Sequence, residues 1–548
     1  SSLLNQTERA FKNKDKTESD RFVDGYVNNF LSGNPITGID NRYKFVQQVL
    51  PTITLQEVNA LASKMENSQG KFALITAPQK DVAKLPGDKE LLNMLAAAHN
   101  IPVKAYEEKT VAKSLIDKLP APGTITNEST NADLGTINLT LNNGITVTLR
   151  PTDFKNDEIK MDSWRLGGSL NYGLKNKTDA ENATAIVDEM GVKDMSSTDL
   201  RKFMAGKTAG VTPYLNPCDE GIQGSSSVKD LEIFFQLLHL YFTQPRRDEK
   251  LFQSYIAAQK NFVKNLSDNP QAYFADTLTK VEYKNSPWAE AFSKANEYEK
   301  INLDTVMSIY KNVFSNPYGW HFTFVGNIDT TKIKSLLEIY IASLPTSPKE
   351  NKFTDVGLRP ANGVVDLAIK KGAAKKSLVN IIFHGETNYS LEDGLKLQAL
   401  TDVLNIKITE ILREDMSGIY GGGMSGSLSK RPYNHYSVTL SLPCGPENVD
   451  KLVKAAFDII KNAQEKGVEQ KDLDKVKETL KKQNEDAMKD NDHWLDGLSM
   501  AWIEQDDPMW ILNYSKKVDA LTLQDIQDAA KKYLNMQNYV KAVLYPEK

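Results

Sequence analysis

Cysteine and histidine are both scarce in this chain of 548 residues, which has 2 cysteines and 6 histidines. Two cysteines, Cys218 and Cys444, are too few for a disulfide framework or a four-cysteine zinc site. A zinc site built on one helix uses two histidines four residues apart. No two histidines here have that spacing; they are His99, His239, His321, His384, His435 and His493. We therefore expect no metal site in this chain.

Long apolar runs and a strong charge of one sign are absent as well. No stretch of about 18 apolar residues occurs, so we expect no segment that spans a membrane. The net charge is −4, which provides no general attraction to DNA or RNA. A content of 40% hydrophobic and 25% charged residues is typical of a globular protein, and the length predicts about two to four domains.

One segment recurs within the chain and predicts its organisation. Residues 54–78 and 522–546 align over 25 residues without a gap and share eight identical positions. Each copy begins with Thr-Leu-Gln, in which the Thr can cap a helix, and continues through a polar turn into an apolar strand. Residues 302–329 form a looser third copy, with Asn302 as the cap. The closing segment of one structural unit therefore occurs three times along the chain.

The repeat divides the chain into five predicted parts. In order they are the closing part of a truncated α+β domain at 1–80, a linker at 81–134, a complete α+β domain at 135–330, a linker at 331–365 and a second complete α+β domain at 366–548. Strands and amphipathic helices mix in the complete domains, and Asn143-Gly144 between two strands is a strong hairpin signal. We expect the α+β class, with mostly antiparallel sheets packed against helices.

The stretch LREDMSGIYGGGMSG, residues 412–426, contains glycines with the spacing of a dinucleotide-binding loop, G-x-G-x-x-G. Such a loop follows a strand and opens a helix, whose N-terminus holds the pyrophosphate. Here the predicted helix precedes the glycines and the predicted strand follows them, which disfavours nucleotide binding. Two interpretations remain for Arg413: a cation that stabilises a helix C-terminus before a mobile connection, or a residue that contacts a ligand.

Several segments, in this order and spacing, resemble the insulinase/pitrilysin family of zinc metallopeptidases. LREDMSGIYG resembles the LRxxxxxxY segment in the last domain of the family, and FTFVGNID, residues 322–329, resembles the strand that ends its domains. LSLPCGPENVDKLVKAAFDII and the segment that runs from residue 8 to residue 61 add to the likeness. The resemblance covers essentially the whole chain. It corresponds to the end of the second domain and to the third and fourth domains of a bacterial processing-protease-like member.

The catalytic signature of the family is H-x-x-E-H on a helix of the first domain, with a distal Glu as the third zinc ligand. The two histidines bind zinc and the intervening Glu is the general base for the zinc-bound water. The equivalent place here, DAENATAIVDEM at 179–190, has acids and no histidine. The resemblance therefore implies zinc in a missing N-terminal part, no catalytic residue in this chain, and no activity for this chain alone.

The resemblance also gives the glycine-rich stretch a role. In family members the last domain helps to enclose a chamber, where an Arg and a Tyr seven residues apart contact the bound peptide near the scissile carbonyl. Arg413 and Tyr420 match these positions, and their side chains offer a fork of N–H donors and one hydroxyl. A flexible loop that lets the peptide approach closely is expected at four glycines. They are Gly421, Gly422, Gly423 and Gly426.

Two functions therefore remain open at the level of sequence. One is the C-terminal portion of a zinc-dependent endopeptidase, which binds peptide and completes the chamber. The other is a non-catalytic scaffold or peptide-binding subunit of the same fold. The expected partners are the missing N-terminal part and a peptide substrate, without nucleic acid. Long bacterial relatives are often exported, so the resemblance implies a periplasmic location.

Overall fold

The computed structural model describes residues 2–66, 72–77, 79–98, 101–102, 104, 114–419 and 421–548. The chain divides into two compact units, Ser1–Ser114 and Leu115–Lys548. The described part of the first unit is helical. Its α-helices are α1 (Ser2–Lys12), α2 (Ser19–Ser32), α3 (Gly38–Val49), α4 (Leu55–Glu66) and α5 (Asp88–Ala98). Helices α1 and α3 pack together, with the rings of Phe11 and Tyr43 stacked at a centroid distance of 4.9 Å.

Helix α4 begins as the repeat predicted, whereas the strand expected after it is not formed. The hydroxyl of Thr54 accepts a hydrogen bond from the backbone N–H of Glu57 at 3.2 Å, and the Glu57 carboxylate accepts one from the N–H of Thr54 at 2.8 Å. Residues 72–77 are without regular structure, so the prediction of a strand there was wrong. A strand needs a neighbour to satisfy its backbone groups. The described part of the first unit contains no other strand.

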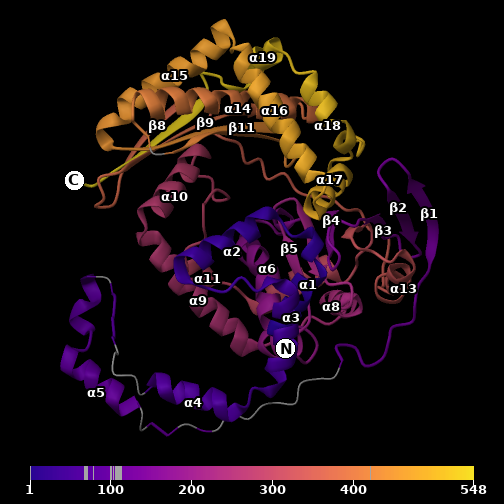
Figure 1. Ribbon diagram of the computed structural model, residues 1–548. Helices are drawn as coiled ribbons and strands as arrows, with labels where there is room; N and C mark the ends of the chain where they lie inside the picture. Colours follow the sequence, from indigo (N-terminus) through magenta and orange to yellow (C-terminus); the bar gives the residue numbers. More distant parts are fainter. Residues whose placement is uncertain are drawn as a thin grey trace. The chain divides into compact units, whose positions relative to one another are not determined.

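The second unit contains a seven-stranded sheet, and Figure 1 labels its strands β1 to β5. Its strands are β1 (Ile125–Asn131), β2 (Thr136–Leu141), β3 (Thr146–Pro151), β4 (Ile159–Leu166), β5 (Ala209–Leu215), β6 (Asp219–Ser226) and β7 (His321–Gly326). The order is β1-β2-β3-β7-β4-β6-β5, and only β3 and β7 run parallel. The predicted turn at Asn143-Gly144 joins β2 and β3, where the positive φ of +81° at Gly144 suits glycine. Strand β1 lies within the range expected as a linker.

A five-stranded sheet follows in the same unit. Its strands are β8 (Val364–Lys370), β9 (Ser377–Glu386), β10 (Gly423–Ser429), β11 (His435–Cys444) and β12 (Tyr539–Tyr545). The order is β10-β11-β9-β12-β8, and only β8 and β12 run parallel. Without the β1–β2 extension, the first sheet reads β5-β6-β4-β7-β3, which is the same topology strand for strand. The α+β class with two duplicated, mostly antiparallel sheets is therefore confirmed.

Helices follow the strands in matching order. Between and after the strands of the first sheet lie α6 (Lys177–Met190), α7 (Ser197–Phe203), α8 (Leu231–Thr243), α9 (Glu249–Asp268), α10 (Pro270–Glu282), α11 (Ala295–Tyr298), α12 (Leu303–Phe314) and α13 (Thr330–Tyr340). Between the strands of the second sheet lie α14 (Leu391–Lys407), α15 (Val449–Lys466), α16 (Gln470–Ala487), α17 (Asn491–Glu504), α18 (Trp510–Asp519) and α19 (Leu523–Tyr533). Helix α13 lies in the range expected as the second linker. None of the helices in the described part of the chain combines the length and apolarity needed to cross a bilayer.

The two repeated helices are capped as predicted. The side chain of Asn302 accepts a hydrogen bond from the N–H of Thr305 at 3.0 Å at the start of α12. At the start of α19, Thr522 and Asp525 form the same reciprocal capping box as Thr54 and Glu57. Each helix then leads into a central strand of its sheet, β7 or β12.

Each sheet also receives a helix from the other half of the unit (Figure 1). Helix α10 packs against β8 and β12, where Phe274 and Leu278 join an apolar cluster with Val540 and Leu544. Helix α17 packs against β4 and β7, where Leu498 belongs to a cluster that includes Val325. Since α10 and α17 occupy equivalent places in the order of elements, the exchange is reciprocal. It ties the two halves of the unit together through two separate cores.

Candidate functional site

Arg413 lies on the segment that continues helix α14. Residues Ile408–Asp415 form a π-helical stretch, η6, which widens the helix before it ends. π-Helical turns are rare and occur frequently at functional sites. The Arg413 side chain is exposed, and the adjacent Leu412 is buried. The guanidinium makes no hydrogen bond or ion pair with any described residue. Tyr420, the second predicted contact residue, lies outside the described residues.

The prediction of a flexible glycine loop was wrong for Gly423 and Gly426, which belong to strand β10. Only Gly421 and Gly422 precede the strand. β10 packs closely against α14, and this closeness explains the glycines. A Cβ at Gly423 would lie 2.7 Å from the side-chain oxygen of Asn405, and one at Gly426 would lie 2.9 Å from the side chain of Leu397. These glycines therefore allow β10 to lie close to α14.

Helix α6 occupies the place where the resemblance would put a zinc-binding helix, and its acids are engaged elsewhere. Asp179 accepts a hydrogen bond from the backbone N–H of Asn302 at 2.7 Å, and Asp188 accepts one from the hydroxyl of Tyr241. Across the described residues, no cluster of three or more His, Cys, Asp or Glu side chains could hold a metal ion. The residues of α6 therefore do not fit zinc.

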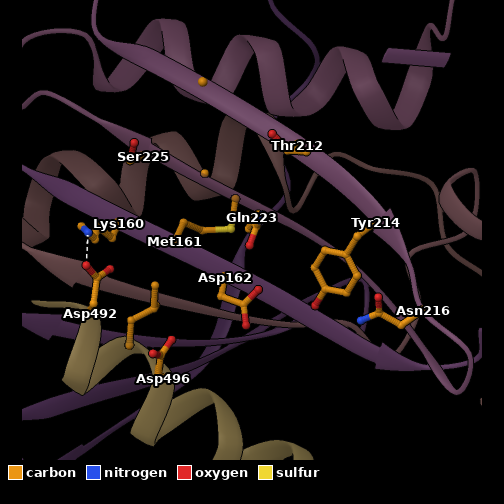
Figure 2. Close-up of a pocket in the computed structure, with 13 residues that line it drawn as sticks. Lys160, Met161, Asp162, Thr212, Tyr214, Asn216, Gln223, Ser225, Asp492 and Asp496 are labelled. Atoms are coloured by element: carbon orange, nitrogen blue, oxygen red, sulfur yellow. Dashed lines mark hydrogen bonds and ion pairs between the residues drawn. The ribbon is translucent and has the colours of Figure 1, made fainter. Parts of the chain in front are cut away.

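A polar cleft of about 720 Å³ lies on the first sheet, and sequence reasoning did not find it. Figure 2 shows side chains from β4, β5 and β6 on one side of the cleft and from α17 on the other. Because side chains alternate along a strand, Lys160 and Asp162 face the cleft while Met161 is buried. Thr212 and Tyr214 of β5 extend the polar surface toward the edge of the sheet.

The cleft contains carboxylates in an environment that disfavours their charge. Burial raises the pKa of Asp162 to about 6, and burial also raises the pKa of Asp496 on α17. Lys160 pairs with Asp492 at the rim, as the dashed line in Figure 2 marks. The hydroxyl of Tyr214 donates to the backbone oxygen of Ser163 at 2.9 Å. This arrangement can accept hydrogen bonds and hold a cationic group. Its acids come from segments about 330 residues apart, so no local sequence motif contains both.

Three comparisons relate this chain to known proteins. The family model described as the peptidase M16 inactive domain matches residues 300–480. The Arabidopsis thaliana protein named zinc protease PQQL-like is 22% identical over 512 residues, which are 90% of this chain and 51% of that protein. The Escherichia coli protein named probable zinc protease PqqL is 21% identical over 529 residues, which are 94% of this chain and 55% of that protein.

Solved structures show the same fold. The periplasmic protease PqqL from Escherichia coli has a TM-score of 0.71 at 19% identity, covering 99% of this chain and 60% of that chain. The ferredoxin protease FusC, solved as a mutant in complex with Arabidopsis ferredoxin, has a TM-score of 0.71 at 18% identity, covering 97% of this chain and 58% of that chain. The chain thus spans little more than half the length of the relatives that it matches.

Proposed function

Because the chain belongs to the insulinase/pitrilysin family, peptidase family M16, we propose that it forms the C-terminal portion of a zinc-dependent endopeptidase. In this proposal it contributes peptide binding and closes a chamber, while the zinc site lies in the part of the protein outside this chain. The observation that carries the proposal is the match of nearly the whole chain to little more than half of proteins named zinc proteases. The duplicated domains support it.

The assignment of zinc to another part of the protein rests on chemistry of the residues present. A zinc site needs deprotonated His, Cys or carboxylate ligands that converge on one point. The acids of α6 instead bind a backbone N–H and a tyrosine hydroxyl. No such convergence exists in the described part of the chain. We propose that a complete protein would supply zinc, as a Lewis acid and water activator, from its remaining portion.

Arg413 and Tyr420 are the proposed peptide contacts. The exposed guanidinium of Arg413 presents planar N–H donors that fit a peptide carbonyl or a developing oxyanion. Its position at the end of a π-helical segment supports this role, because a side chain used only to stabilise a helix end needs no such irregularity. The proposed location is the periplasm, in line with the Escherichia coli structural relative described as a periplasmic protease.

The test is Arg413→Ala in the complete protein that contains this chain, with kinetics on a peptide that it cleaves. If the donor acts on the oxyanion, kcat should fall by roughly 10²–10³. A rise in KM with kcat unchanged would indicate equal binding of ground and transition states. Glu414→Ala is the matched control, since Glu414 is the exposed neighbour of opposite charge. Wild-type kinetics for Arg413→Ala would refute the contact.

The alternative function, a non-catalytic scaffold or peptide-binding subunit, is favoured by the description of the matching family model as an inactive domain. The same complete protein separates the two proposals. A purified complete protein that holds no zinc and cleaves no peptide, yet binds peptide through this chain, would establish the scaffold.

A further inference from the structure

Strand β10 forms one end of its sheet and leaves backbone groups open. It pairs with β11 on one side only. On the other side, the N–H of Met424 donates to the Asn405 side chain at 2.7 Å, and the Asn405 amide donates to the Met424 oxygen at 2.9 Å. Both backbone groups of Met424 therefore point away from β11. The Asn405 side chain imitates a neighbouring strand at this one residue.

The alternation of an antiparallel strand extends this geometry to the rest of β10. The N–H and C=O of one residue point to the same side, and those of every second residue point the same way. Gly426 and Leu428 therefore also direct their backbone groups away from β11. No described residue forms a hydrogen bond with these groups. An open edge of this kind accepts an added strand from another polypeptide.

A cavity of about 570 Å³ runs beside this open edge. Helix α14 provides one wall with Gly394, Gln398 and Asp402, which are spaced so that they share a helix face. Helix α18 provides the aromatic rings of Trp510 and Tyr514. The hydroxyl of Tyr514 donates to the side-chain oxygen of Gln398 at 3.3 Å, which holds the ring against α14.

Asp402 is the unusual group in this cavity. Its side chain is partly buried, and burial raises its pKa. It forms no hydrogen bond or ion pair with any described residue. Lys517 of α18 pairs with Glu392 at 2.9 Å and lies 5.3 Å from the centre of the Trp510 ring, so its charge is engaged at the start of α14. A partly buried carboxylate without a partner is costly, and a cation supplied by a ligand would offset this cost.

We propose that the cavity beside β10, called the recess below, is a subsite for an extended peptide. The peptide adds to β10 as a further strand and places a Lys or Arg side chain beside Asp402. The backbone groups of Gly426 and Leu428 pair with the peptide, and the rings of Trp510 and Tyr514 contact the stem and the charge of its basic side chain. The occupant follows from charge complementarity and from the open edge. The inference deepens the proposed function, because it rests on peptide binding and adds a preference for basic residues.

The experiment measures binding of short peptides to this chain by calorimetry. An acetylated, amidated Thr-Val-Thr-Lys-Val-Thr peptide is compared with the same peptide carrying norleucine in place of lysine. We expect the lysine peptide to bind about tenfold more tightly, as an attraction of about 1.4 kcal/mol requires. Asp402→Asn should abolish this difference. Equal affinity of the two peptides, or an unchanged preference in Asp402→Asn, would overturn the subsite.

Two further measurements test the strand pairing and the location. Lysine peptides N-methylated at every second residue, one for each of the two alternations, lose the N–H donors of one edge. One of the two should bind at least tenfold more weakly, and equal affinities for both would contradict strand addition. Asp496→Asn removes an acid from the cleft on the first sheet and should leave binding unchanged. A loss of the lysine preference in that variant would move the site there.

The outcome is separable from that of the proposed function. Proteolysis by the complete protein and its response to Arg413→Ala test the chamber and the oxyanion contact. Peptide affinity of this chain and its response to Asp402→Asn test the recess. A complete protein without peptidase activity would leave the recess standing, and a recess without preference for lysine would leave the peptidase standing.

Discussion

The two sheets share one strand topology, yet the segments that lead into their edge strands differ. In the first half, α6 ends at Gly191, where φ is +88°, and a regular helix α7 with a Ser196–Asp199 capping box precedes β5. In the second half, α14 continues into the π-helical η6, and no further regular helix occurs among the described residues before β10. The two halves therefore share their strand order and differ in the connection that precedes the edge strand. The proposed ligand contacts lie at and beside this connection.

The sheets also differ in the burial of the ion pairs that join their strands. In the first, Arg165 of β4 lies directly opposite Glu220 of β6, with side chains 1% and 5% exposed, and its Nε donates to the carboxylate at 2.9 Å. Arg165 also donates to the backbone oxygen of Val313 at 2.8 Å. In the second, the pair Lys541–Asp366 joins β12 and β8 with Asp366 62% exposed. The first sheet thus depends on a buried network and the second has its pair at the surface.

The largest expected effect is the loss of that buried pair. Glu220→Gln leaves the Arg165 guanidinium buried without a counter-charge and should destabilise the unit by about 3–5 kcal/mol. Asp366→Asn, the matched change on the second sheet, should cost less than about 1 kcal/mol because its charge is solvated. Urea unfolding measures both. Similar losses for the two variants would contradict the difference between the sheets.

The helix exchange predicts a second, symmetric effect. Leu278 on α10 and Leu498 on α17 are each 6% exposed and pack on the sheet of the opposite half. Leu278→Ala and Leu498→Ala should each destabilise by about 2–5 kcal/mol, through lost burial and the cavity left behind. Thermal unfolding of both variants checks this. A loss at only one of the two positions would show that the exchange is reciprocal in geometry but not in energy.

The fold was predictable where local signals and tertiary structure agree. The cap, helix and strand of the repeat were read correctly at 302–329 and 522–546, because both strands enter complete sheets. The same pattern failed at residues 72–77, where no described neighbour is present to pair with. Strand β10 was missed because the tertiary structure imposes a strand where the local sequence does not indicate one. Its sequence, GMSGSLS, lacks apolar alternation, and its strand conformation comes from pairing with β11 and packing on α14.

The candidate sites divide in the same way. Arg413 could be singled out because it lies in a contiguous motif, and its exposed position fits a contact residue. Asp162 and Asp496 could not, because they meet only after α17 has crossed to the first sheet. Asp402 carried no sequence signal either. On α14 it is one of several acids, and only the absence of a partner distinguishes it.

A matched pair of glycines sharpens the comparison of the two edge strands. A Cβ at Gly426 of β10 would lie 2.9 Å from Leu397, which is 1% exposed and cannot move aside. A Cβ at Gly210 of β5 would meet nothing within 4 Å. Gly426→Ala should therefore destabilise by about 1–3 kcal/mol, whereas Gly210→Ala should be neutral or slightly stabilising. Denaturant midpoints of the two variants test this, and equal midpoints would contradict the close packing of α14 on β10.

The smallest effect at mildly acidic pH concerns the histidines of the two sheets. Burial lowers the pKa of His321 on β7 from 6.5 to about 3, while its ring nitrogen lies 2.8 Å from the hydroxyl of Thr146. Burial also lowers the pKa of His384 on β9. Below a pH of about 6.5 these histidines bind protons in the unfolded chain but stay neutral in the folded protein. The free energy of unfolding therefore falls as the pH falls.

At about pH 5.5, one unit below the usual pKa, the loss from His321 should be about 1.4 kcal/mol. It should continue to grow down to about pH 3, where the folded histidine itself becomes protonated. His321→Gln should remove this dependence, and the pH profile of unfolding for His384→Gln provides the comparison on the second sheet. A profile for His321→Gln parallel to that of the unmodified chain would show that His321 is protonated in the folded state, and hence that water reaches the space between β7 and α17.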